Sequence, residues 1–234
     1  MKAIIKREFA SYFAHPVGYL FIGVTFLLAS FSFFIDVFLY ATTDIAPVFS
    51  TLFSLVYLIV PLITMRLLSE EKRHKTEQVF YTSPVTMTEV IFGKFFGAGL
   101  IYIAATAIVF VHQLVLAFYG SPDWGLLFCR YIGLILLGGL LIAIGLVVSA
   151  LTESQAVAAI VALAISMVMG QVDSLTQSSS SQTLIKITEW ISPGHHFTGF
   201  FNGNFSVADV FYYLSMTGLL LFVAVRILDR KRWA

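Results

Sequence analysis

The chain has 234 residues, of which 59% are hydrophobic and 12% are charged, and its formal net charge is +1. Because soluble domains usually carry about a quarter of charged residues, this composition excludes a water-soluble globule. The net charge gives no support for binding nucleic acid, and the single cysteine, Cys129, excludes an internal disulfide. We therefore predict an all-α membrane protein that forms one transmembrane domain over residues 1–234.

The amino-terminal residues 1–15 are too short and too charged to cross a bilayer. Ile5, Phe9 and Tyr12 recur at the spacing of one apolar helix face, whereas Arg7 lies on the opposite side. This pattern predicts an amphipathic helix that lies along the cytoplasmic surface of the membrane.

Six apolar segments follow, and each is long enough to cross the hydrocarbon core, which takes about 20 helical residues. Twelve of the fourteen Lys and Arg lie at the amino terminus, in the stretch 66–94 and in the carboxyl tail. Because Lys and Arg near span ends are retained in the cytoplasm, we expect both termini and this stretch on the cytoplasmic side. The predicted spans are residues 17–41, 47–68, 90–119, 126–151, 155–172 and 207–228.

The polar region 69–89, between the second and third spans, predicts two helical pieces that are separated at the Ser-Pro pair 83–84. Thr86 or Thr88 is placed to cap the second piece, with Glu89 in its first turn. A simple turn would need only a few polar residues, so this length favours a coupling helix that docks on another protein. The alternative is a solvated linker that anchors two spans by charge.

The segment 173–206, between the fifth and sixth spans, is long for a structureless loop. Its first part is rich in serine. In its second part, Leu184, Ile187 and Trp190 fall at helical spacing. We therefore predict an external helical hairpin whose second part lies in or on the outer leaflet.

Strongly polar residues within spans are candidates for function, because burying them in a bilayer is costly. Asp36 in the first span, and His112 with Gln113 in the third, are candidates for a substrate path. The alternative for Asp36 is a position at the membrane surface, and for the other two it is hydrogen bonding between helices. The histidine pair 195–196 lacks a third ligand at suitable spacing, so no metal site is expected.

Three blocks of the chain resemble the type-2 ATP-binding cassette (ABC) exporter permeases, in particular those of gliding motility and of nitrous-oxide-reductase maturation. The block 65–97 resembles their cytoplasmic coupling element, the block 131–159 their fourth span with its turn, and the last block, from residue 203, their final span. The pair 74–75 departs from the subset, which often has Thr-Gly there. The matching residues of the first block are Met65, Arg66, Glu70, Glu71, Lys72, Arg73, Thr76, Glu77, Ser83, Pro84, Val85, Glu89, Val90, Gly93, Lys94 and Phe95.

The resemblance implies a permease subunit in a bacterial cytoplasmic membrane, with a second permease protomer and a separate cytoplasmic ABC ATPase as partners. ATP and magnesium would bind to that ATPase, because this chain has no GxxxxGKS or GxxxxGKT loop, and neither a cofactor nor enzymatic activity of its own is expected. One alternative is a non-transporting anchor that relays ATPase cycles to an envelope partner. An independent channel or carrier is disfavoured by the lack of charged relays at the midplane. The implied ATPase-coupling residues are Glu70, Glu71, Arg73, Thr76 and Glu77.

Overall fold

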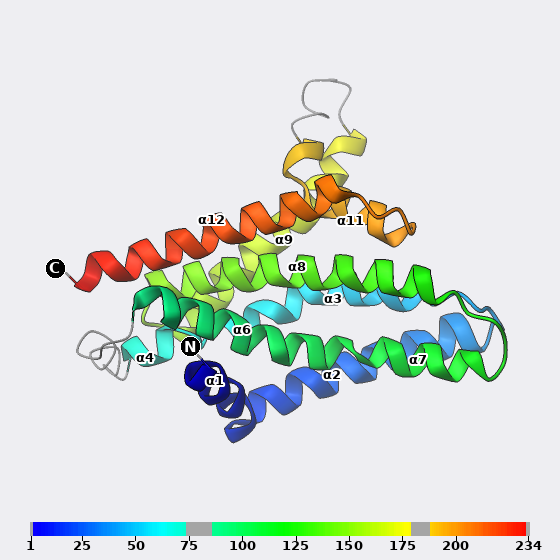
Figure 1. The fold of residues 1–234 in the computed structure, drawn as a ribbon, viewed down its shortest axis with the longest axis horizontal. Helices are drawn as coiled ribbons and strands as arrows, with labels where there is room; N and C mark the ends of the chain where they lie inside the picture. Colours follow the sequence, from blue (N-terminus) through cyan, green and yellow to red (C-terminus); the bar gives the residue numbers. More distant parts are fainter. Residues whose placement is uncertain (1, 74–85, 179–187, 233–234) are drawn as a thin grey trace.

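Long helices that lie side by side make up nearly all of the fold (Figure 1). The computed structural model describes residues 2–73, 86–178 and 188–232, and the side chains of all of these except 173–178 and 231–232. No β-strand occurs in these ranges. Six helices are long and apolar enough to cross a membrane, which confirms the predicted all-α class. The spans are Pro16–Phe38, Ala46–Arg73, Met87–Ala117, Trp124–Leu151, Gln155–Val172 and Val207–Arg230.

The second span consists of two helices that are separated by a turn at residues 65–68, and two further spans contain interruptions that hydropathy does not predict. The first passes from α2 (Pro16–Ser32) into a π-helix, η1 (Phe33–Phe38). The third passes from α6 (Met87–Thr106) into α7 (Ile108–Ala117) at a single turn residue. Short π-helical segments inside α-helices are rare and often mark functional sites. The other helices are α1 (Lys2–Ala14), α3 (Ala46–Thr64), α4 (Ser69–Arg73), α8 (Trp124–Leu151), α9 (Gln155–Ser178), α11 (Pro193–Phe201) and α12 (Val207–Arg232).

Helix α8 forms the centre of the bundle and contacts α3, α6, α9, α11 and α12. In its most apolar window 72% of the residues are buried, against 22% in the windows of α9 and α12. Glycines let its neighbours approach closely. A Cβ atom on Gly133 would lie 2.6 Å from the Cβ of Phe200, and one on Gly145 would collide with Thr64.

The segment between the fifth and sixth spans is partly helical. Helix α9 continues to Ser178, beyond the predicted span 155–172. Residues 188–191 are helical, and α11 follows and packs against α8 and α12. Of the residues whose spacing predicts a helix here, Leu184 and Ile187 lie outside the described residues.

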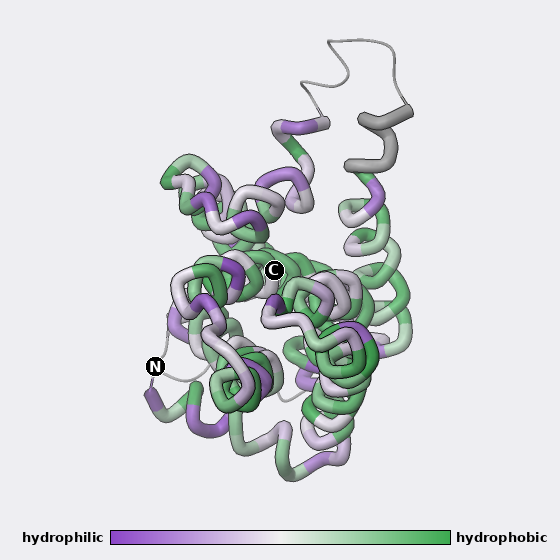
Figure 2. The backbone as a smooth tube through the Cα atoms, turned by 90° about the vertical axis from the view of Figure 1, so that its right-hand side faces the viewer, coloured by the Kyte–Doolittle hydropathy of each residue, from purple (hydrophilic) through white to green (hydrophobic). Residues whose placement is uncertain are grey.

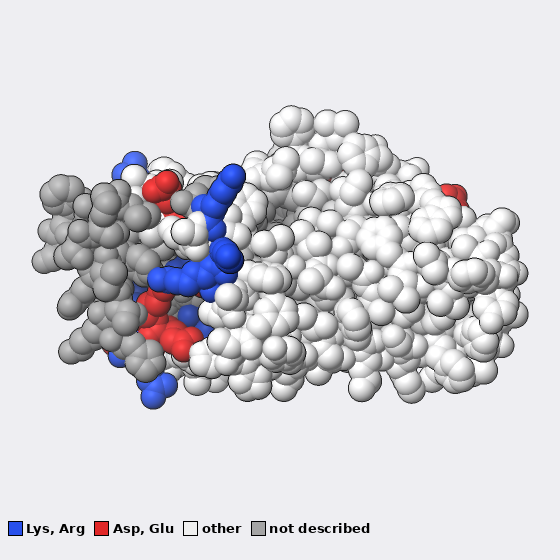
Figure 3. All heavy atoms as spheres, turned by 60° about the horizontal axis from the view of Figure 1, so that its bottom comes forward, with Lys and Arg blue, Asp and Glu red and all other residues white. Residues whose placement is uncertain are grey.

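Charge is distributed unevenly along the bundle. The helices are predominantly apolar along their length in Figure 2. In Figure 3, charged side chains gather at one end of the molecule and leave most of the remaining surface on this face uncharged. This end, which we call the charged end, holds α1, α4 and the turn between α8 and α9 (Figure 1). The opposite end, which we call the outer end, holds the loops 39–45 and 118–123.

Candidate coupling site at the charged end

Helix α1 lies directly on α6, and two glycines make this close approach possible. A Cβ atom on Gly93 would lie 2.6 Å from Cγ2 of Ile4, and one on Gly97 would lie 2.7 Å from the Cβ of Glu8. Any larger residue at either position would push α1 away. The two glycines are four residues apart, which is the spacing that brings helices together in membranes.

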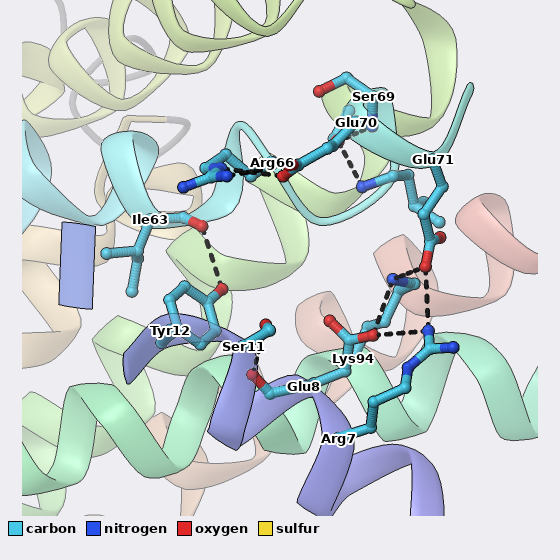
Figure 4. A network of polar contacts seen from close by, with 12 residues as sticks. Arg7, Glu8, Ser11, Tyr12, Ile63, Arg66, Ser69, Glu70, Glu71 and Lys94 are labelled. Carbon is cyan, nitrogen blue, oxygen red and sulfur yellow. Dashed lines mark hydrogen bonds and ion pairs between the residues drawn. The ribbon is translucent and has the colours of Figure 1, made fainter. Parts of the chain in front are cut away.

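Four charged side chains form a cluster between α1, α4 and α6 (Figure 4). The Nζ atom of Lys94 lies 3.1 Å from Oε1 of Glu8 and 2.9 Å from Oε1 of Glu71. Nη2 of Arg7 lies 3.0 Å from each of the same two oxygen atoms. Two positive and two negative groups therefore balance. The balance matters because the Lys94 side chain is only 1% exposed, and a buried ammonium group needs anionic partners.

The short helix α4 is also fastened to the end of α8. Oγ of Ser149 accepts hydrogen bonds from the amides of Leu68 and Ser69, each at 2.9 Å. Lys72 donates to the carbonyl oxygen of Ala150, which belongs to the last turn of α8. Carbonyl groups at the end of a helix lack partners within the helix and attract cations. Thus α4 is held by α1 and α6 on one side and by α8 on the other.

A further bond ties α1 to the end of α3. The hydroxyl of Tyr12 donates to the carbonyl oxygen of Ile63 at 3.0 Å. Burial, together with the Glu8 carboxylate, raises the pKa of this hydroxyl far above its usual value, so it remains a donor at any physiological pH. Beside it, Arg66 binds both carboxylate oxygens of Glu70, at 2.8 and 2.9 Å. A cavity of about 250 Å³ lies among these side chains.

The structure places three of the five residues for which the sequence implies a contact with an ATPase. Glu71 belongs to the charge cluster, and Glu70 forms an ion pair with Arg66, four residues earlier in the chain. The Arg73 side chain is exposed. Thr76 and Glu77 lie outside the described residues. The glutamates therefore have structural partners within the chain, and the contact of all five with an ATPase stays a prediction.

The exposed part of the charged end contains a second hollow. A cavity of about 580 Å³ is lined by Met65, Arg73 and the turn between α8 and α9, including Glu153 and Ser154. It lies next to α4, on the α8 side. The positive charge of Arg73 and the negative charge of Glu153 are thus both accessible at this cavity.

The candidates for a substrate path do not converge on one site. Asp36 is exposed on η1. The Nε2 atom of His112 lies 3.1 Å from Oγ of Ser30 on α2, so this residue connects two helices. Gln113 donates from Nε2 to the carbonyl oxygen of Asp123 at 3.1 Å. The three side chains have different hydrogen-bond partners, and a role in transport stays a prediction for each.

The histidine pair lies on α11. Nδ1 of His196 is 2.6 Å from Oδ1 of Asp209, and its ring stacks on Tyr212. The residues that the structure describes contain no group of three or more His, Cys, Asp or Glu that could hold a metal ion. His196 therefore links α11 to α12.

Sequence reasoning does not predict the pairing of Glu8 with Lys94, because 86 residues separate them. Two signals were available. A lysine lies within the helix that forms the third span, and the spacing from Gly93 to Gly97 marks a helix contact on both sides of it. The sequence does not show which helix packs against these glycines.

The comparison with known families agrees with this architecture. Residues 38–228 match the profile of the family described as "ABC-2 family transporter protein", which is 191 of the 234 residues. The match includes α4, α6 and α8, and it leaves α1 outside. No curated protein matches the chain. The chain therefore belongs to the ABC-2 family of transporter proteins, as a membrane-spanning permease component.

Proposed function

We propose that this permease subunit pairs with a second permease protomer and a separate cytoplasmic ATPase, and that the complex exports a cargo across a bacterial cytoplasmic membrane. The family match supports the permease role. The resemblance to the gliding-motility and nitrous-oxide-reductase-maturation permeases supports the direction of transport. In this arrangement the charged end and both termini face the cytoplasm, and ATP with magnesium binds to the ATPase.

The observation that carries the proposal is the fastening of α4 to three other helices. Glu71 binds Lys94 on α6, and through it Glu8 on α1, while Ser149 on α8 accepts two amide bonds from the start of α4. Buried polar contacts are costly to break, so a displacement of α4 moves these helices as a group. An ATPase that pushes on the charged end would thereby move spans and not only a loop.

The alternative function is a relay to an envelope partner without transport. It is supported by contacts at the outer end, where Nε of Arg130 on α8 donates to the carbonyl oxygen of Phe201 on α11 at 2.8 Å. Motion of α8 would therefore also reach α11. Cargo flux distinguishes the two functions, because a relay would hydrolyse ATP without accumulating cargo.

The test is reconstitution of the permease in lipid nanodiscs with an ATPase encoded beside it. We expect the wild-type permease to stimulate ATP hydrolysis, and Arg73→Glu to lose most of that stimulation because it reverses an exposed charge at the end of α4. Lys2→Glu reverses an exposed charge at the same end and should retain it. Full stimulation by Arg73→Glu at every salt concentration would contradict the predicted docking surface.

A further inference from the structure

A polar cavity of about 220 Å³ lies at the outer end, where residues of the loops 39–45 and 118–123 line it together with Gln113 and the start of α8. Exposed aromatic residues, among them Tyr40 and Tyr119, lie on the same loops. Tyrosines concentrate at the level of lipid headgroups, which places the cavity at the surface of the membrane. Its volume suits a small headgroup and is below that of sites for drug-sized ligands.

The positive charge in the cavity is already neutralised. Arg130 is 5% exposed, and its Nη1 and Nη2 atoms lie 2.5 and 3.5 Å from the two carboxylate oxygens of Asp44. Burial alone would raise the pKa of Asp44, but hydrogen bonds from Arg130 and from the amide of Ala46 outweigh it and hold that pKa below its usual value. Asp44 is therefore ionised, and its charge is matched by Arg130.

Two groups of the cavity lining are still unmatched: the negative charge of one carboxylate and the oxygen atom of one amide. Asp123 also lines the cavity, so its lining holds two carboxylates and one guanidinium, and one negative charge has no matching positive charge there. Oδ1 of Asp123 caps α8 by accepting from the amide of Leu126 at 3.1 Å. Gln113 is 2% exposed, and its Oε1 atom is buried without a hydrogen-bond partner among the described residues.

The orientation of the Gln113 amide is fixed by its neighbour. Its Nε2 atom donates to the carbonyl oxygen of Asp123, so exchanging the nitrogen and oxygen would set two acceptors against each other. The unpaired group is therefore an acceptor. Buried polar groups are nearly always satisfied, so this acceptor requires a donor other than the described residues.

We propose that this cavity binds a primary ammonium group, such as that of an ethanolamine headgroup or of a free amine. An ammonium group brings one positive charge for Asp123 and N–H donors for Oε1 of Gln113. A quaternary ammonium group would match the charge but leave Gln113 unpaired. A divalent cation fits worse, because calcium and magnesium take six or more oxygen ligands and both oxygens of Asp44 already face Arg130.

The experiment measures the binding of radiolabelled ethanolamine by equilibrium dialysis. The full chain is held in nanodiscs that lack phosphatidylethanolamine. We expect saturable binding that tetramethylammonium does not displace. Asp123→Asn should weaken binding about tenfold or more, because asparagine keeps the helix cap and removes the charge. Gln113→Leu should also weaken binding, because it removes the amide oxygen that accepts from the ammonium group. Glu189→Gln, which removes a carboxylate outside the cavity lining, should bind as the wild type does.

A second arm distinguishes the two sources of the ammonium group. If nanodiscs that contain phosphatidylethanolamine bind less ethanolamine, a lipid headgroup occupies the cavity. If they bind the same amount, the cavity serves a soluble amine. Three results would overturn the proposal: no ethanolamine binding by the wild type, equal displacement by tetramethylammonium, or wild-type affinity in both the Asp123→Asn and the Gln113→Leu variants.

Discussion

Replacing Lys94 by methionine tests the charge cluster most directly, because methionine keeps most of the volume and removes the charge. The variant leaves the carboxylates of Glu8 and Glu71 close together without their buried cation. Breaking a buried ion pair by removing one partner costs ~3–5 kcal/mol. Because Arg7 still contacts both carboxylates, we expect a smaller loss of unfolding free energy, about 2–3 kcal/mol.

Arg7→Met provides the matched comparison, since Arg7 contacts the same two oxygen atoms as Lys94. The Arg7 side chain is 57% exposed, so its contacts resemble surface ion pairs, which contribute ~0–1 kcal/mol. We therefore expect a small effect from Arg7→Met and a large effect from Lys94→Met. The assay is thermal unfolding in detergent, together with hydrogen exchange of residues 2–14, which should exchange faster only in the lysine variant.

The triple variant Glu8→Gln, Glu71→Gln and Lys94→Met removes all the buried charges at once. Such neutral replacements are often tolerated, so it should recover much of the stability that Lys94→Met loses. Equal losses in Lys94→Met and Arg7→Met would refute the reasoning, because burial would then not decide the energy of the cluster.

Three further predictions concern packing, pH and topology. Gly97→Leu should destabilise the contact between α1 and α6 by ~1–3 kcal/mol, measured by thermal unfolding, whereas Gly99→Leu, which meets open space, should not. Asp44→Asn should lower the unfolding midpoint by the same amount from pH 8 to pH 5. Because the folded-state pKa of Asp44 is lowered, its contribution is fully present above the unfolded pKa of 3.8 and is lost only as pH falls through the lower folded value. A cysteine at Ser178 should react with a membrane-impermeant thiol reagent in intact cells, and one at Arg232 should not; the reverse would contradict the topology.

The sequence predicts six membrane-spanning helices because a bilayer imposes one simple requirement on each of them. Apolar length alone predicts six helices, and a short-range rule predicts a helix cap at Thr86 or Thr88. The structure shows that Thr86 is the cap of α6 and that it forms a capping box with Glu89. Both kinds of signal depend on residues that are close together in the chain. They are therefore readable without knowing which helices are neighbours.

The candidate site was less predictable, because its contacts join distant parts of the chain. The residue spacing on α1 indicates an apolar face, yet the structure also buries Glu8 on this helix. Its charge is neutralised by Lys94 on α6. Likewise, hydropathy assigns the first span to continuous helix. It carries no information on whether a hydrogen bond spans four residues or five, so it does not reveal the π-helix η1.

Helix α8 is uninterrupted, whereas the first and third spans are interrupted in their outer halves, so they differ in how they can respond to a push from the charged end. Helix α8 has 28 residues, or about 42 Å at ~1.5 Å per residue, and its carbonyl ladder has no break. A displacement at Ser149 therefore moves α8 as a rod and reaches Arg130 near its other end. The first and third spans instead contain η1 and the turn at Ala107, where backbone hydrogen bonds are already rearranged and bending is least costly. Motion between the ends would then concentrate in the outer halves of these two spans, beside His112 and the loops that line the polar cavity.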